Sequence, residues 1–242
     1  MAGVAIFQLF RRLFGQIAGK NVQLINLQKQ LDYFFSDTNL LVQAITHKSI
    51  APDYATNYER LEFLGDTVID HVISEKLFHE FPEASEGILT KKRSALVQKS
   101  FLANMGNLLG LLTYISAASS VDLTQEKVSQ KQLANVYEAI IGAMHLDGGI
   151  EPCEKLIELT TWSHRHEAWK NINYKGLLIE YCQGNQLVTP KFTVTNIEGP
   201  EHEKVFEIAV VVENREFPSA SGVTKKAAEQ DAAQIALDEL NP

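Results

Sequence analysis

The chain has 242 residues, of which 45% are apolar, so it is long enough for one or two domains with hydrophobic cores. Its formal net charge of −8 argues against binding nucleic acid over the whole surface, because such binding is mainly electrostatic, and any nucleic-acid site must be local. The two cysteines, Cys153 and Cys182, have no CxxC spacing and no neighbouring histidine pattern, so neither a zinc site nor a disulfide framework is indicated.

The first residues, VAIFQLFRRLFGQIAGK, place apolar side chains around Arg11 and Arg12. Two interpretations remain, a short amphipathic helix or a plain extension that packs on the first domain. Charged residues interrupt the apolar stretches well before the roughly 18 residues that a membrane span needs, and no signal-peptide cleavage pattern is present. We therefore expect a cytoplasmic protein that makes no contact with a membrane.

From about Asn21 to Glu167 apolar residues recur at spacings of three and four, the pattern of an all-α domain. Loop signals interrupt this pattern at Pro52, Pro82, Gly87 and the pair Gly148 and Gly149. The clearest predicted helices between these signals are Leu61–Glu80, Ser94–Leu109 and Gln132–Leu146.

Two of the predicted helices carry oxygen-bearing side chains within apolar sequence. Glu62 and Asp66 are four residues apart, so their carboxylates share one helix face, where they repel each other. Since no Lys or Arg lies three or four residues away to neutralise them, we expect a hard cation there. Asn135 and Glu138 form a second pair. Oxygen ligands from two helices favour Mg²⁺ or Mn²⁺ over zinc, although solvated acidic positions at this spacing are also common on helices.

Four ordered blocks resemble the ribonuclease III family over residues 22–165. The most specific is ERLEFLGD, Glu59–Asp66, which is similar to the signature of that family. THKS at Thr46–Ser49, EGILTKKRSALV at Glu86–Val97 and ANVYEAIIGAMHLDGG are similar to three further blocks of the family. The resemblance implies an all-α endonuclease domain that uses a metal ion and no small-molecule cofactor.

The resemblance also implies roles for the four oxygen-bearing residues. Glu62 and Asp66 match the first pair of metal ligands and Glu138 matches the glutamate of the second pair, with Asp66 and Glu138 at the centre of catalysis. Asn135 stands where the family usually has aspartate. Its carbonyl oxygen can still ligate a hard cation, but the site loses one negative charge, so we expect weaker metal binding or a shifted metal preference.

Two other signature residues imply a partner subunit. Glu59 matches a supporting or subunit-contacting glutamate, and Phe63 matches an aromatic residue that inserts into a socket on the partner in this family. Simple core packing is the alternative for Phe63. The resemblance therefore implies a homodimer. His47 is given no catalytic role, because a lone histidine in a helical domain is more often structural.

After the polar stretch SHRHEAWKNIN the pattern becomes that of a small α+β domain. Lys191–Val194 and Val205–Val212 alternate or are rich in β-branched residues, which predicts strands, and a third strand is expected near Glu213–Pro218. A helix over Tyr174–Cys182 precedes these strands and another over Lys225–Leu240 follows them. The predicted order is α-β-β-β-α.

This α+β unit, residues 173–241, resembles a double-stranded RNA-binding domain, mainly through TKKAAEQDAA at the start of the last helix. Two lysines there stand at a helix N-terminus, which favours phosphate. Three other residues match minor-groove contacts, although a flexible loop is the alternative for the histidine among them. The RNA-binding residues implied by the resemblance are Lys225, Lys226, Glu180, Gln183 and His202. Since residues 171–242 carry a net charge of −5, we expect modest and strongly salt-sensitive binding.

Together the two resemblances imply an endoribonuclease specific for double-stranded RNA. Metal-assisted hydrolysis of a phosphodiester in each strand would leave 5′-phosphates and short 3′ overhangs, in the processing of rRNA and mRNA precursors. The alternative is a non-catalytic double-stranded RNA-binding protein on the same fold. Asn135 favours that alternative, whereas the presence of all three acidic ligands speaks against it.

Overall fold

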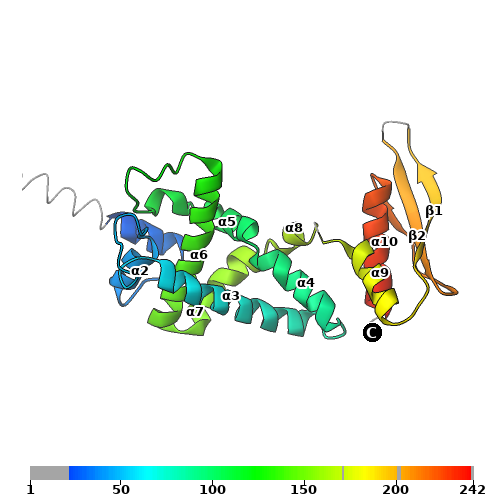
Figure 1. The fold of residues 1–242 in the computed structure, drawn as a ribbon, viewed down its shortest axis with the longest axis horizontal. Helices are drawn as coiled ribbons and strands as arrows, with labels where there is room; N and C mark the ends of the chain where they lie inside the picture. The colour runs from blue at the N-terminus through cyan, green and yellow to red at the C-terminus, as the bar shows by residue number, and fades with distance from the viewer. Residues whose placement is uncertain (1–21, 171, 201–202, 241–242) are drawn as a thin grey trace, which may run out of the picture. The chain divides into compact units, whose positions relative to one another are not determined.

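The computed structural model describes residues 22–170, 172–200 and 203–240 (Figure 1). The chain divides into two compact units at Lys170, except that residues 77–92 group with the C-terminal unit. The predicted fold class, an all-α domain followed by a small α+β domain, is confirmed. The amphipathic segment predicted near the N-terminus lies outside the described residues.

The described part of the first domain is built mainly of helices, beginning with a helix over residues 22–30, and an isolated β-bridge joins Thr46 to Ser116. Among the helices lie a short 3₁₀ turn, η1, and a short π-helical turn, η2. The elements that follow residue 30 are α2 (Thr38–Ala44), α3 (Glu59–Glu80), α4 (Glu86–Val97), α5 (Lys99–Leu108), η1 (Leu111–Tyr114), α6 (Glu126–Gly148), α7 (Ile150–Ile157), η2 (Glu158–Trp162) and α8 (Arg165–Trp169).

Helix α6 is the central helix of this domain. All of its residues from 132 to 144 are buried, because other helices cover every side of it. The hydroxyl group of Tyr137 shares hydrogen bonds with the hydroxyls of Thr160 (2.6 Å) and Thr161 (2.9 Å) in η2. These bonds satisfy the buried polar end of Tyr137 and fix the rotation of α6 about its axis.

Helices α3 and α6 cross in direct backbone contact through two glycines. A Cβ atom at Gly65 would lie 1.8 Å from the carbonyl oxygen of Glu138, and one at Gly142 would lie 2.2 Å from the carbonyl oxygen of Leu61. Only glycine allows so close an approach. The oxygen-bearing turns of the two helices therefore face each other.

The C-terminal end of α6 anchors the segment that leads into α2. The carboxylate of Asp147 accepts hydrogen bonds from the Tyr33 hydroxyl (2.7 Å) and from the backbone N–H groups of Ser36 (2.9 Å) and Asp37 (2.8 Å). Gly149, with φ of 80°, then ends the helix, as the predicted loop signal at this position indicated.

The single helix predicted over Ser94–Leu109 is wrong, because the chain breaks at Gln98. Its backbone is extended (φ −64°, ψ 140°), so α4 ends at Val97 and α5 begins at Lys99. Gly87, predicted as a loop signal, instead lies in the first turn of α4. Nothing in the sequence marks the break, since Gln98 is neither Gly nor Pro and makes no side-chain cap.

The second domain packs two helices on one face of an antiparallel sheet. Strand β2 pairs with β1, β3 and β4, with Lys191 opposite Val211 and Phe206 opposite Gly222. The third strand predicted near Glu213–Pro218 is present as the two-residue strand β3, and it ends before Pro218, which lacks a backbone N–H group for the ladder. Strand β4, which follows Pro218, was not predicted. The elements are α9 (Tyr174–Gly184), β1 (Lys191–Glu198), β2 (Val205–Val212), β3 (Arg215–Glu216), β4 (Ala220–Gly222) and α10 (Lys225–Leu240).

Apolar side chains from β2 and from both helices form the core of this domain. Strand β1, by contrast, is largely exposed. The buried residues of this core include Leu178, Cys182, Val210, Val212, Phe217, Ala233, Ala236 and Leu237.

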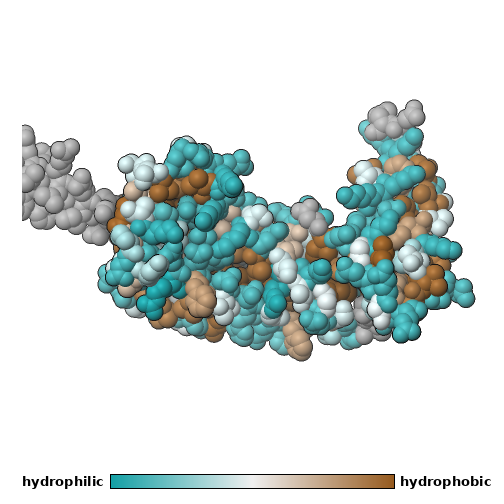
Figure 2. Space-filling model, viewed as in Figure 1, coloured by the Kyte–Doolittle hydropathy of each residue, from teal (hydrophilic) through white to brown (hydrophobic). Residues whose placement is uncertain are grey.

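Hydrophilic residues cover most of the face of the molecule drawn in Figure 2. None of the helices among the described residues is long and apolar enough to cross a membrane.

We expect Gly65→Ala to lower the free energy of unfolding by about 3 kcal/mol or more, because the new methyl group would have to displace the backbone of α6. Gly87→Ala is the matched control, since a Cβ there meets nothing within 4 Å, and it should be neutral or stabilise by up to about 1 kcal/mol. Urea denaturation followed by circular dichroism measures both. Equal effects of the two substitutions would contradict a tight helix crossing.

Candidate active site

Glu138 is the most deeply buried acidic group at the helix crossing. Its side chain is only 1% exposed, and its Oε1 atom has no hydrogen-bond partner among the described residues. Burial raises the pKa of this carboxyl to about 7, against the opposing effect of Lys99, and the negative charges of Glu62 and Asp66 raise it further. A buried carboxylate oxygen without a partner is a position that a cation can fill.

The ammonium group of Lys99 joins three of the four predicted ligands. Its Nζ atom donates to Glu138 Oε2 (2.6 Å), Glu62 Oε1 (3.1 Å) and Asn135 Oδ1 (3.1 Å). Lys99 is the first residue of α5, so the positive charge comes from a third helix. Lys99 was not among the predicted site residues, because spacing within one helix cannot reveal a lysine supplied by another.

Asp66 lies one turn after Glu62 on α3 and is exposed. Its charge reaches Glu138, whose pKa it raises, but it is not one of the oxygens that Lys99 contacts. The structure therefore draws Glu62, Asn135 and Glu138 together and leaves Asp66 at the edge of the group. Within the described part of the chain, no three His, Cys, Asp or Glu side chains are yet arranged to hold a metal ion.

The donor set nevertheless fits a hard divalent cation. All four side chains offer oxygen, and Oε1 of Glu138 is buried and unpartnered. Three carboxylates and one amide carbonyl suit Mg²⁺ or Mn²⁺, which bind oxygen, better than zinc. The assignment of these four residues as metal ligands stays a prediction.

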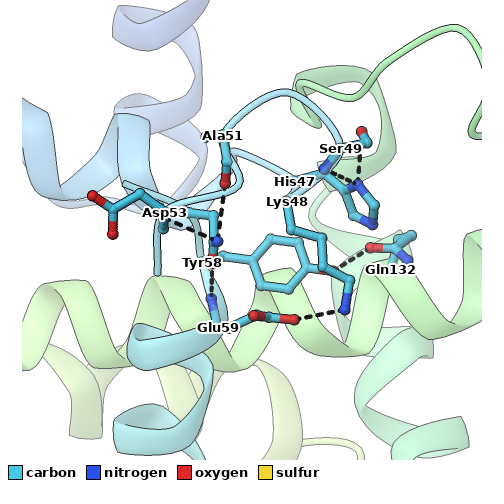
Figure 3. Close-up of polar contacts among 9 residues, drawn as sticks. His47, Lys48, Ser49, Ala51, Asp53, Tyr58, Glu59 and Gln132 are labelled. Atoms are coloured by element: carbon cyan, nitrogen blue, oxygen red, sulfur yellow. Dashed lines mark hydrogen bonds and ion pairs between the residues drawn. The ribbon is translucent and has the colours of Figure 1, made fainter. Parts of the chain in front are cut away.

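Glu59 is held by hydrogen bonds within the chain, whereas the side chain of Phe63 is exposed. Glu59 accepts from the ammonium group of Lys48 at 2.8 Å (Figure 3). Its backbone N–H donates to the Asn57 side chain at 2.9 Å. Phe63 is 78% exposed, so core packing does not explain it within one chain. Phe63 lines one side of a largely apolar pocket of about 630 Å³, whose other lining residues are Gln43, Tyr54, Ala55, Glu59, Arg60, Leu61, Leu64 and Leu146.

A second cavity, of about 740 Å³, opens beside the cluster and is lined in part by Glu62, Lys99 and Asn135. On its wall the Tyr58 hydroxyl donates to Gln132 at 2.6 Å (Figure 3). The other lining residues are His47, Lys48, Glu59, Ser100, Gln130 and Lys131.

His47 is buried and is held by local hydrogen bonds. Its Nδ1 atom accepts from the backbone N–H of Ser49 (3.0 Å) and lies 2.8 Å from the Ser49 hydroxyl (Figure 3). Burial lowers the pKa of His47. These contacts account for the histidine as a structural residue of the loop.

The predicted RNA-binding residues of the second domain are exposed where the structure describes them. Glu180 and Gln183 share one face of α9, and Lys225 and Lys226 begin α10. His202 lies outside the described residues.

The lysines at the start of α10 and the lysine of α9 differ in how available they are to phosphate. The hydroxyl of Thr224 accepts from the backbone N–H of Ala227 at 3.1 Å, which caps the start of α10. Lys175, by contrast, is paired with Glu229 at 2.7 Å and is therefore less available to phosphate than the two lysines of α10.

Comparison with known proteins identifies both domains. A family model described as Ribonuclease-III-like matches residues 37–163, and one described as Double-stranded RNA binding motif matches residues 174–240. The protein called Ribonuclease 3 from a Sulfurovum species is 39% identical over 217 residues, which cover 88% of this chain and 96% of the relative. Ribonuclease 3 from Campylobacter jejuni subsp. jejuni is 39% identical over 224 residues, 91% of this chain and 98% of the relative.

A solved structure agrees with these matches. The nuclease domain of ribonuclease III from Campylobacter jejuni, described for structural flexibility in a region involved in dimer formation, is 42% identical. It aligns with a TM-score of 0.52 and covers 56% of this chain and 96% of that domain.

The raised pKa of Glu138 predicts how pH affects stability. Between the ordinary value of 4.5 and about 7 the folded protein keeps a proton that the unfolded chain has released, so this stabilisation is lost as the pH rises through about 7. In the presence of a chelator, we expect Glu138→Gln to gain stability relative to the unsubstituted protein between pH 5 and pH 8, by roughly 3 kcal/mol. Denaturant unfolding across this range measures the difference.

Glu151→Gln is the control for this measurement, because Glu151 is exposed on the surface beside Lys155. A stability difference for Glu138→Gln that stays constant from pH 5 to pH 8 would show that the folded state does not raise the pKa of this group.

Proposed function

Because this chain belongs to the ribonuclease III family and is an endoribonuclease specific for double-stranded RNA, we propose that oxygen ligands of α3 and α6 hold a divalent cation that it needs for cleavage. The ion is Mg²⁺, with Mn²⁺ able to substitute. The observation that carries this proposal is the buried Oε1 atom of Glu138, which has no hydrogen-bond partner among the described residues, while Lys99 links the Oε2 atom to Glu62. Asp66 and Asn135 complete the proposed ligand set.

The proposed chemistry is hydrolysis without a covalent intermediate. When bound, the cation supplies a Lewis acid that polarises the phosphate and lowers the pKa of a bound water molecule. Glu138 would contribute negative charge from a buried position and Glu62 from a half-buried one, and exposed Asp66 would stand at the side open to the substrate. Asn135 contributes a neutral oxygen, so the site attracts the cation less strongly than four carboxylates would.

We place RNA contacts on the exposed residues of the second domain. Lys225 and Lys226 would contact phosphates at the N-terminus of α10, where unpaired backbone N–H groups add to their charge. Glu180 and Gln183 would contact the 2′-hydroxyls of the minor groove, as would His202. The acidity of this domain makes such contacts few, so binding should weaken steeply as salt is raised.

We further propose that the chain works as a homodimer. An aromatic ring that is 78% exposed beside an apolar pocket suits burial against a second copy of the same surface. In a symmetric dimer Phe63 of each protomer would enter the pocket of the other, and Glu59 would lie at the same contact. Two sites would then act on the two strands of one duplex.

The products would carry 5′-phosphates and short 3′ overhangs, and the role would be processing of rRNA and mRNA precursors in the cytoplasm. A duplex offers little base-specific contact, because the major groove of A-form RNA is deep and narrow. Shape and strandedness would therefore decide which segments are cut. Nothing among the matches favours a non-catalytic protein.

We expect the purified protein to cut a long RNA duplex with Mg²⁺ or Mn²⁺ and not with a chelator. Glu138→Gln should lower the cleavage rate by about 100-fold or more while duplex binding remains. Mapping the ends of the products measures both cutting and the overhang, and Glu151→Gln serves as the matched surface control. A duplex that is bound but left intact in both metals would refute the proposed chemistry.

Phe63→Asp should convert the dimer to a monomer, because a charge placed at a buried apolar contact is costly. Phe78→Asp is the control, since Phe78 is also exposed on α3, at 66%, but lies four turns away. Sedimentation analysis of the two variants gives the oligomeric state, and circular dichroism checks that both are folded. Dissociation by both substitutions, or by neither, would argue against Phe63 as the dimer contact.

A further inference from the structure

Lys99 engages three of the four side chains proposed to hold a divalent cation, and Oε1 of Glu138 is left without a partner among the described residues. Its ammonium group contacts one oxygen each of Glu62, Asn135 and Glu138, which come from two different helices. We propose that Lys99 is a tethered competitor of the metal ion: it holds the ligand oxygens together in the metal-free protein and must leave them before the ion binds. This inference rests on the proposed metal site and concerns how that site is filled.

The first support is the charge at the helix crossing. Glu138 is 1% exposed, and an ionised carboxylate at that depth needs a positive partner. In the absence of a metal, Lys99 is that partner, and it also bridges Glu62 at 3.1 Å. An ammonium group and a divalent cation cannot share the same oxygen atoms without strong repulsion. Binding of one therefore requires displacement of the other.

The second support is that Lys99 is able to leave. Its side chain is 55% exposed although its ammonium group is held, so the packing around it leaves room for the side chain to move. The cavity of about 740 Å³ that it lines offers polar partners away from the ligands, among them Ser100 and Gln130. Displacement needs only rotation of side-chain bonds and no movement of α5.

The position of Lys99 also follows from the break at Gln98. Since α5 begins at Lys99, this side chain leaves the helix at its first residue, where no preceding turn restricts it. A continuous helix from Ser94 onward would have surrounded the same side chain with a turn on either side. The break therefore places a flexible cation at the edge of the oxygen cluster.

The test is binding of Mn²⁺ to the full chain without RNA at pH 8, measured by electron paramagnetic resonance of the free ion. We expect Lys99→Met to bind Mn²⁺ about tenfold more tightly than the unsubstituted protein, because the competing charge is gone. Lys99→Gln should do the same, and it keeps a hydrogen-bond donor if the methionine variant folds poorly. Lys155→Met, which removes an exposed lysine paired with Glu151, should leave the affinity unchanged.

A second measurement uses thermal unfolding in a chelator and then in Mn²⁺. Lys99→Met should lower the melting temperature in the chelator, where Glu138 loses its partner, and should gain more from added Mn²⁺ than the unsubstituted protein does. Equal or weaker Mn²⁺ binding by both Lys99 variants would overturn the competitor role and leave the metal site standing. No Mn²⁺ binding by any of the proteins would overturn the metal site itself, and this inference with it.

Discussion

The crossing of α3 and α6 at Gly65 and Gly142 is the constraint on which the candidate site depends. Without side chains at the contact, the backbones approach until a single added carbon would overlap a carbonyl oxygen. This distance brings the oxygen-bearing turns of two separate helices within reach of one ammonium group, that of Lys99. Any larger residue would push the helices apart, and the four oxygen donors would then lie too far from one another to act together.

The same closeness has an electrostatic consequence. Packing α6 on all sides removes Glu138 from water, so its charge must be balanced within the protein or by a bound ion. Lys99 supplies that balance from α5. In the proposed metal site, binding of the ion would then exchange one cation for another, and Asn135, which is neutral, adds no charge for either cation to balance.

Periodicity and motifs predicted much of this structure, and their failures have physical reasons. The last helix, Lys225–Leu240, and the end of α6 at Gly149 were predicted well, because both lie at strong local signals. The break at Gln98 was not, since it depends on how α4 and α5 pack and not on a Gly or Pro. Lys99 could not be found either. Its partners lie 36 to 39 residues away, and nothing in one sequence tells which lysine will meet which acid.

The hydrogen bonds of Asp147 affect how the first domain folds during synthesis. It binds the Tyr33 hydroxyl and the Ser36 backbone across 114 and 111 residues of chain. During synthesis the segment before α2 therefore emerges from the ribosome long before its anchor exists. Local helices can form in that interval, but the hydrogen bonds that hold the segment before α2 cannot form until α6 is complete. The nascent domain is thus exposed to misfolding and to proteases until its last long helix has been translated.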